Sequence, residues 1–178
     1  MEQIRISAKN LGKIALNDFC ERCFYIDLHT KKLPWQIFPG IFSSLDSYQK
    51  KVAHIWIQRH IEGKEAPHFI KDLDVTGFIK APHRSKFFIE IPKYGIRLNG
   101  MLDDIWTLNS GKIHLVDFKT ARYTASQDKL LGMYKTQLNG YNLIASSGTN
   151  FPEIDSMSII YNEPQTDEAN AVEWAHKD

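Results

Sequence analysis

The N-terminal part of the chain carries apolar side chains at helical spacing, which predicts two amphipathic helices. The first covers residues 7–29 and begins at Ser7. A loop rich in proline and glycine follows, and the second helix covers residues 45–61. The apolar side of this second helix is predicted to carry Tyr48, Val52, Ile55 and Trp56.

Shorter apolar runs follow, and most of them predict strands. Residues 64–83 show no clear period and receive no assignment. Three strands, a helix and a last strand are then predicted, over residues 86–91, 96–108, 112–119, 126–146 and 156–161 respectively. Helices followed by a strand meander, a helix and a strand indicate an α/β fold with a mixed central β-sheet flanked by α-helices.

The composition is that of an ordinary globular protein, with 43% hydrophobic and 24% charged residues among 178. This length predicts a single domain over residues 1–178, with the polar stretch 163–178 either frayed or a truncated C-terminal extension. No run approaches the roughly 20 apolar residues of a membrane helix, and the polar start is unlike a signal peptide. We therefore expect a cytoplasmic protein without a membrane partner. The net charge is only +1, so any nucleic-acid site must be built locally.

Two cysteines, Cys20 and Cys23, are too few for a disulfide framework. Their Cys-x-x-Cys spacing could form half of a zinc or iron–sulfur site, but a second pair is missing. We expect packing thiols in a reducing cytoplasm, with a redox or metal role as the lesser alternative.

Acidic residues gather around one predicted hairpin. Residues 109–111, Asn-Ser-Gly, form a three-residue turn with glycine suited to the left-handed position. If Leu108 pairs with Lys112, the same register places Asp103 opposite Asp117. Opposed residues of an antiparallel pair point to the same face, about 5 Å apart at Cβ.

Two facing carboxylates among apolar neighbours repel, so either one is protonated or a cation lies between them. Ligands that are all oxygen suit Mg²⁺ or Mn²⁺. Lys119 shares this face, two residues beyond Asp117. The inference depends on register, because a slip of one residue would put Asp104 in the place of Asp103. The alternative is that both acids are solvated near the turn and Lys119 is an exposed strand end.

Three motifs, in this order, resemble the RecB-like branch of the PD-(D/E)XK nuclease superfamily. They are Gly100-Met-Leu-Asp103, the strand HLVDFKT that contains Asp117-Phe118-Lys119, and Gln137-Leu-Asn-Gly-Tyr141. The N-terminal segment SAKNLGKIALNDFCERCFYI also resembles the opening helix of these nucleases. The resemblance extends from about residue 7 to 161, is strongest between 100 and 141, and implies a restriction-endonuclease-like core.

The resemblance also implies roles for the motif residues. Asp103 and Asp117 would hold Mg²⁺ or Mn²⁺, with the backbone carbonyl of Phe118 as a further ligand. Lys119 would orient the attacking water and offset charge on the phosphate. On the helix, Gln137 and Tyr141 lie one turn apart and would face the site to contact the nucleic-acid strand. The alternative for this last pair is a core tyrosine and a surface glutamine.

The chain departs from the family pattern in two respects. These nucleases usually carry a histidine ligand near the start of the helix before the sheet, where this chain has Asp46. His54 lies two turns deeper, and Glu90 could reach the metal from a neighbouring strand, so any of the three or none adds a ligand. In addition, Cys20 and Cys23 lack C-terminal partners, so an iron–sulfur cluster is not expected.

The expected function is that of a metal-dependent nuclease, a DNA exonuclease that hydrolyses phosphodiester bonds in repair, recombination or CRISPR-type defence. Its partner would be nucleic acid, with DNA favoured, in a larger repair or defence complex. The alternative is a non-catalytic nuclease-fold module that binds nucleic acid or a protein partner. A hydrolase for another phosphoester is a third reading, although the absence of a glycine-rich phosphate loop argues against an NTPase.

Overall fold

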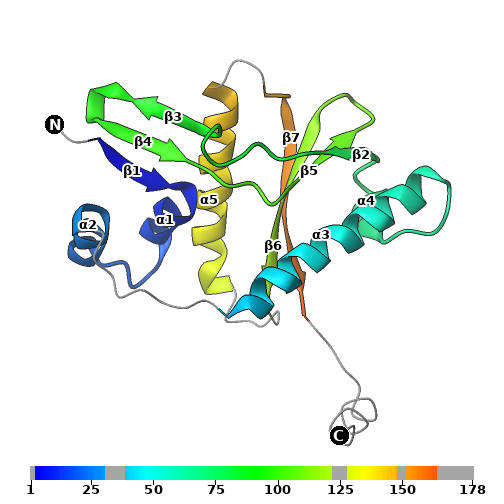
Figure 1. Ribbon diagram of the computed structural model, residues 1–178, viewed down its shortest axis with the longest axis horizontal. Helices are drawn as coiled ribbons and strands as arrows, with labels where there is room; N and C mark the ends of the chain where they lie inside the picture. Colours follow the sequence, from blue (N-terminus) through cyan, green and yellow to red (C-terminus); the bar gives the residue numbers. More distant parts are fainter. Residues whose placement is uncertain (1–2, 31–38, 122–127, 148–150, 164–178) are drawn as a thin grey trace, which may run out of the picture.

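The computed structural model describes residues 3–30, 39–121, 128–147 and 151–163, which form helices and two mixed β-sheets (Figure 1). The helices are α1 (Ala8–Gly12), α2 (Glu21–Thr30), α3 (Gly40–Ile61), α4 (His68–Lys71) and α5 (Asp128–Ser147), with 3₁₀ turns η1 (Lys13–Ala15) and η2 (Pro92–Tyr94). The strands are β1 (Ile4–Ser7), β2 (Val75–Ile79), β3 (Phe88–Ile91), β4 (Ile96–Asn99), β5 (Asp104–Leu108), β6 (Ile113–Thr120) and β7 (Ile154–Asn162).

The strands divide into a three-stranded sheet of order β1-β4-β3 and a four-stranded sheet of order β2-β5-β6-β7. Each sheet is mixed, because β1 runs parallel to β4 and β6 parallel to β7 while the other neighbours are antiparallel. In Figure 1 the smaller sheet lies to the left of α5 and the larger one to its right. The prediction of a mixed α/β arrangement is confirmed, but two sheets replace the single central sheet that was expected.

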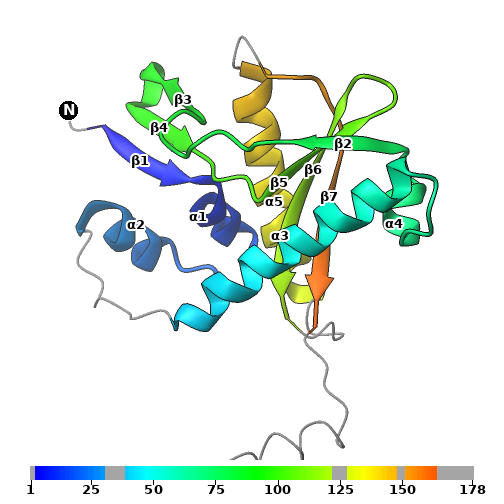
Figure 2. The ribbon, with the colours of Figure 1, turned by 45° about the vertical axis from the view of Figure 1, so that its right-hand side comes forward.

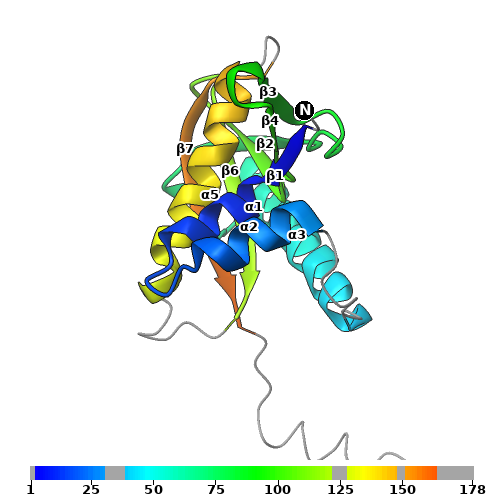
Figure 3. The same cartoon turned by 90° about the vertical axis from the view of Figure 1, so that its left-hand side faces the viewer.

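The larger sheet lies between α5 on one face and α3 with α4 on the other (Figure 2). Alternation along the strands sorts the side chains, since successive residues point to opposite faces. The face toward α5 carries odd-numbered residues, among them Ile105, Ile113 and Leu115, which pack with Leu138 and Ile144. The face toward α3 carries even-numbered residues, among them Trp106, Leu108 and Val116, which pack with Ala53 and Ile57. Figure 3 shows α1 lying against α5 as well.

The predicted β5–β6 hairpin and its register are confirmed as far as Asp104, and the predicted pair of Asp103 with Asp117 lies one step beyond the end of the ladder. The backbone N–H of Leu108 donates to the carbonyl of Lys112 at 3.0 Å, and the ladder continues to the pairing of Asp104 with Val116. Gly111 has φ of 79°, the left-handed conformation that the turn requires. The hydrophobic pattern and the turn therefore fix the same register.

The prediction of one helix over residues 7–29 is wrong. Ile4–Ser7 is a strand, α1 and η1 end at Ala15, and a turn at residues 16–18 precedes α2. Asn17 and Asp18 lie in that turn, because their short polar side chains compete with helical hydrogen bonding. The strand was missed because only Ile4 and Ile6 mark its alternation.

The prediction of one strand over residues 96–108 is also wrong. It divides into β4 and β5, which belong to different sheets, and residues 100–103 connect them. Gly100 makes the crossing possible, since a Cβ there would lie 2.6 Å from the ring of Phe87 and 2.9 Å from that of Tyr141. The chain changes sheet where its backbone passes directly over two aromatic rings.

The predicted helix over residues 45–61 exists as α3 but begins at Gly40. Its predicted apolar side is right only in part. Trp56 packs against the core, but Tyr48 is 65% exposed and Ile55 60% exposed, and the buried residues are Gln49, Ala53 and Ile57. Residues 64–83 contain α4 and the edge strand β2. The remaining predictions, for β3, α5 and β7, are confirmed within a few residues, and residues 164–178 of the predicted frayed stretch lie outside the described residues.

No helix in the described ranges is both long enough and apolar enough to cross a membrane.

Substitution of Gly100 by alanine is expected to lower the free energy of unfolding by about 1–3 kcal/mol, because the new methyl group overlaps two packed rings. Urea denaturation measures the change. Gly40→Ala is the matched control, since a Cβ at this helix position meets nothing within 4 Å. This control should be neutral or slightly stabilising. Equal effects of the two substitutions would contradict the packing argument.

Candidate functional site

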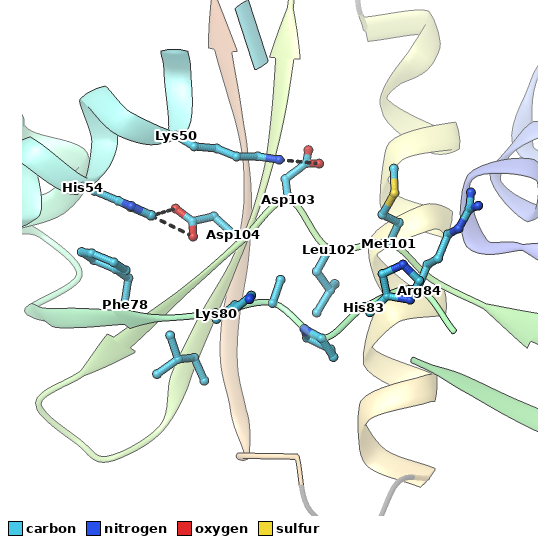
Figure 4. A pocket seen from close by; sticks show the side chains of 13 residues that line it. Lys50, His54, Phe78, Lys80, His83, Arg84, Met101, Leu102, Asp103 and Asp104 are labelled. Carbon is cyan, nitrogen blue, oxygen red and sulfur yellow. Dashed lines mark hydrogen bonds and ion pairs between the residues drawn. The ribbon is translucent and has the colours of Figure 1, made fainter. Parts of the chain in front are cut away.

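The candidate site lies where the two sheets meet. The segment between β2 and β3 and the segment between β4 and β5 both cross this gap, and the N–H of Gly100 donates to the carbonyl of Phe87 at 3.0 Å to join them. A pocket of about 700 Å³ opens here between these two segments and α3 (Figure 4). Lys50 and His54 point into it from α3, toward Asp103 and Asp104 (Figure 4).

Asp103 lies immediately before β5, at the end of the hairpin ladder. The ladder ends at the pair of Asp104 with Val116. Beyond it, the N–H of Phe118 donates to the side chain of Asp103, at Oδ2 and 3.0 Å, and not to a backbone carbonyl of the neighbouring strand. Lys50 Nζ lies 3.7 Å from the other oxygen, Oδ1. The carboxylate is thus held over the β6 backbone, next to Asp117.

Asp117 is buried, and two of its predicted neighbours contact its carboxylate. Lys119 forms an ion pair with Oδ2, and Gln137 Nε2 donates to Oδ1 at 2.9 Å. The same amide donates to the hydroxyl of Tyr141 at 2.7 Å. The structure therefore brings together all five predicted catalytic side chains. The alternative of a surface glutamine is wrong, since Gln137 is 4% exposed and reaches Asp117 rather than solvent.

The charges of this site are only partly balanced. Burial, and then the charge of Asp117, raise the pKa of Asp103 to about 6. Burial and the same charge also raise the pKa of Tyr141, so its hydroxyl stays protonated. Burial lowers the pKa of Lys50, but Asp46 and Asp103 outweigh it and the net shift is upward, so the ammonium stays charged. The positive charges of Lys50 and Lys119 therefore do not fully offset the burial of Asp103 and its repulsion by Asp117.

A divalent cation fits the donor chemistry of this site. Asp103 and Asp117 offer carboxylate oxygens, the ligands that Mg²⁺ and Mn²⁺ prefer, and Mg²⁺ commonly uses only one or two carboxylates besides water and phosphate. In the part of the chain that the structure describes, no group of three or more Asp, Glu, His or Cys side chains is arranged to hold a metal. Any metal would therefore rest on this pair of carboxylates, and the carbonyl of Phe118 stays a prediction.

Asp104 occupies the opposite face of the sheet and has a different environment. Its carboxylate accepts hydrogen bonds from the indole N–H of Trp106 at 2.9 Å and from the backbone N–H of Ile105 at 3.1 Å. His54 Nε2 lies 2.9 Å from the same group. The side chain is 6% exposed, so the reading of Asp104 as a solvated acid is wrong.

The three candidates for an additional metal ligand lie in different places. Asp46 is linked to the site through Lys50, whose ammonium lies 2.9 Å from Asp46 and 3.7 Å from Asp103. His54 is engaged with Asp104 on the other face. Glu90 is exposed on β3 of the smaller sheet and faces Arg97 in the ladder, so the structure does not bring it to the carboxylates.

The two cysteines do not pack, and the prediction of packing thiols is wrong. Both are free and exposed at the start of α2, where the N–H of Cys23 donates to Sγ of Cys20 at 3.3 Å. The thiol and the N–H of Cys23 lower the pKa of Cys20. The predicted long helix is interrupted by the turn at residues 16–18, and α2, which begins at Glu21, has no buried residue, so both thiols lie in solvent.

Sequence reasoning missed Lys50, which touches Asp103, and Gln49, a buried amide that donates to Thr120 next to Lys119. A signal for Lys50 was present. Asp46, Lys50 and His54 recur every fourth residue, so they form one polar stripe along α3. Lys50 and His54 of that stripe line the pocket.

No protein-family model and no curated protein sequence matches the chain. The geometry of the site therefore carries the functional argument.

Asp103→Asn is expected to stabilise the metal-free protein by about 1–3 kcal/mol at pH 8. The fold raises the pKa of Asp103 from 3.8 to about 6. Below pH 3.8 the carboxyl is protonated in the folded and the unfolded protein, so it does not lower the free energy of unfolding. Above pH 6 it is ionised in both, and the full destabilisation is reached. The advantage of the asparagine variant should thus be small near pH 4 and largest above pH 7. Urea denaturation in EDTA at several pH values measures it.

Asp104→Asn is the matched control, one residue away. It removes the charge beside His54 and disturbs the acceptor of Trp106, so it should destabilise by about 1–3 kcal/mol at pH 8. Destabilisation by both substitutions would contradict the view that Asp103 is held at an energetic cost.

Proposed function

We propose that this protein is a metal-dependent nuclease with a restriction-endonuclease-like core, of the RecB-like branch of the PD-(D/E)XK superfamily. One observation carries the proposal: Asp103 meets the β6 backbone between Asp117 and Lys119 at the end of the hairpin. The ordered motifs support it, and so does the mixed four-stranded sheet flanked by α3 and α5.

Within this proposal, Asp103 and Asp117 hold Mg²⁺ or Mn²⁺, with the carbonyl of Phe118 as a further ligand. The metal supplies a lowered pKa for the attacking water and polarises the scissile phosphate. Lys119 is 19% exposed, so its ammonium can orient that water and offset charge on the phosphate in the transition state. Asp103 is a desolvated carboxylate with a raised pKa that lines the pocket, and such acids at a pocket indicate chemistry.

Gln137 and Tyr141 were predicted to contact the nucleic-acid strand, and their contacts in the protein suggest a different role. Both side chains are buried, and the amide of Gln137 contacts Asp117 and the hydroxyl of Tyr141 together. We infer that this pair positions Asp117. The substrate remains a phosphodiester of DNA, cut from an end, in repair, recombination or CRISPR-type defence within a larger complex. The proposal places the protein in the cytoplasm.

One observation favours the alternative of a non-catalytic nucleic-acid or protein-binding module. The ammonium groups of Lys50 and Lys119 each contact one of the two carboxylates, so the pair has some compensation without a metal. The raised pKa of Asp103 shows that this compensation is incomplete, which is why catalysis is the preferred proposal.

Cleavage of end-labelled single- and double-stranded DNA is expected with Mg²⁺ or Mn²⁺ and not with EDTA. Lys119→Ala should reduce the rate by about 100-fold or more, because it removes the charge that faces the phosphate. Lys112→Ala is the matched control at the other end of β6, where the exposed ammonium pairs with Glu153. Its rate should equal that of the unmodified protein.

A measurement without turnover supports the metal assignment independently. Mn²⁺ should raise the free energy of unfolding of the unmodified protein and leave that of Asp103→Asn nearly unchanged. Cleavage that persists in EDTA, or no cleavage with either metal, would contradict the nuclease proposal.

A further inference from the structure

The pocket beside Asp103 extends well beyond the carboxylates. It runs along the end of β2 and the segment that follows it, where Phe78 on β2 and Lys80 and Arg84 beyond it line the pocket, and none of these residues has a part in the chemistry above. In Figure 4, Phe78 lies beneath His54 at one end and Arg84 lies at the other, with the two acids between them. The inference that follows rests on the proposed nuclease function, because it names what this pocket receives.

Phe78 presents an aromatic face that the fold has already fixed in place. Its ring stacks on His54 with centroids 3.6 Å apart and planes 6° from parallel, yet the side chain is 45% exposed. His54 is itself held by Asp104. One face of Phe78 is thus covered by the ring of His54, while nearly half of the side chain is exposed in the lining of the pocket, a combination suited to base stacking.

Lys80 and Arg84 supply positive charge along the same wall. Both are exposed and line the pocket, and within the described ranges neither makes an ion pair or a side-chain hydrogen bond. Lys50 differs, since it is paired with Asp46 and Asp103. Unpaired cations beside an aromatic face match the phosphate and the base of a nucleotide.

We propose that this pocket binds a single-stranded stretch of nucleic acid, with one base stacked on Phe78 and its phosphates against Lys80 and Arg84. A strand bound in this way continues past Asp103, so its backbone reaches the carboxylate pair. A duplex does not fit this arrangement, because the faces of its bases are already stacked on one another. A volume of about 700 Å³ is in the range that holds a compact ligand, which suits one or two nucleotides.

The test is fluorescence anisotropy in EDTA, where no metal-dependent cutting interferes. The probes are fluorescein-labelled oligo(dT) and oligo(U) of about 12 nucleotides, and the duplex of oligo(dT) with oligo(dA). Phe78→Leu keeps an apolar side chain but removes the aromatic face, and should raise Kd for a single strand about tenfold. Phe78→Trp keeps an aromatic face, and its Kd for a single strand should stay near that of the unmodified protein. Lys80→Gln should weaken binding and lower the salt dependence by about one phosphate contact.

The matched controls are Tyr94→Leu and Lys93→Gln, which remove an exposed aromatic ring and a lysine at η2, outside the pocket. Urea denaturation shows that each variant is folded. Equal binding by Phe78→Leu and Tyr94→Leu, or duplex bound as tightly as single strand, would overturn the inference whatever the cleavage assay shows. Phe78-dependent binding without metal-dependent cleavage would support the inference and count against the nuclease.

Discussion

The register of the β5–β6 hairpin is the constraint on which the site depends. Gly111 closes the turn in the left-handed conformation, and the pairing of Leu108 with Lys112 then determines the face to which every later side chain points. Asp117 and Lys119 therefore face α5, where Gln137 contacts Asp117 and the ring of Tyr134 lies beside the ammonium of Lys119. A shift of one residue would exchange the two faces, bury charges among the residues that pack on α3, and disperse the site.

Neighbouring acids have opposite relations to the fold because of this alternation. Asp104 is surrounded by donors from His54, Trp106 and the backbone, so its buried charge is compensated and supports the packing of α3. Asp103 lies beside Asp117 with fewer donors, and its carboxylate form is disfavoured. The charge of Asp103 is compensated only in part at the pocket, so the carboxylate does not serve stability, and this contrast supports the proposal of a chemical role for Asp103.

The boundary between the two sheets gives the site its surroundings. Because β4 and β5 belong to different sheets, Asp103 emerges at a gap instead of within a ladder, and Gly100 permits the close crossing over Phe87 and Tyr141. The end of β2 brings Phe78 to the pocket, and the segment that leaves β2 crosses the same gap and brings Lys80 and Arg84. The boundary between the two sheets therefore brings the acids next to the aromatic and basic residues of the pocket.

The sequence by itself determined what local pattern and turn chemistry control: the hairpin, its register, the faces of Asp117 and Lys119, and the helical spacing of Gln137 and Tyr141. Only the tertiary structure decided the rest. The division into two sheets, the burial of Gln49 instead of Tyr48, the approach of Lys50 to Asp103 and the engagement of His54 by Asp104 all join residues that are distant along the chain. Periodicity reports which residues share a face of one element. It does not report which other element covers that face, because the packing of the whole chain sets that choice.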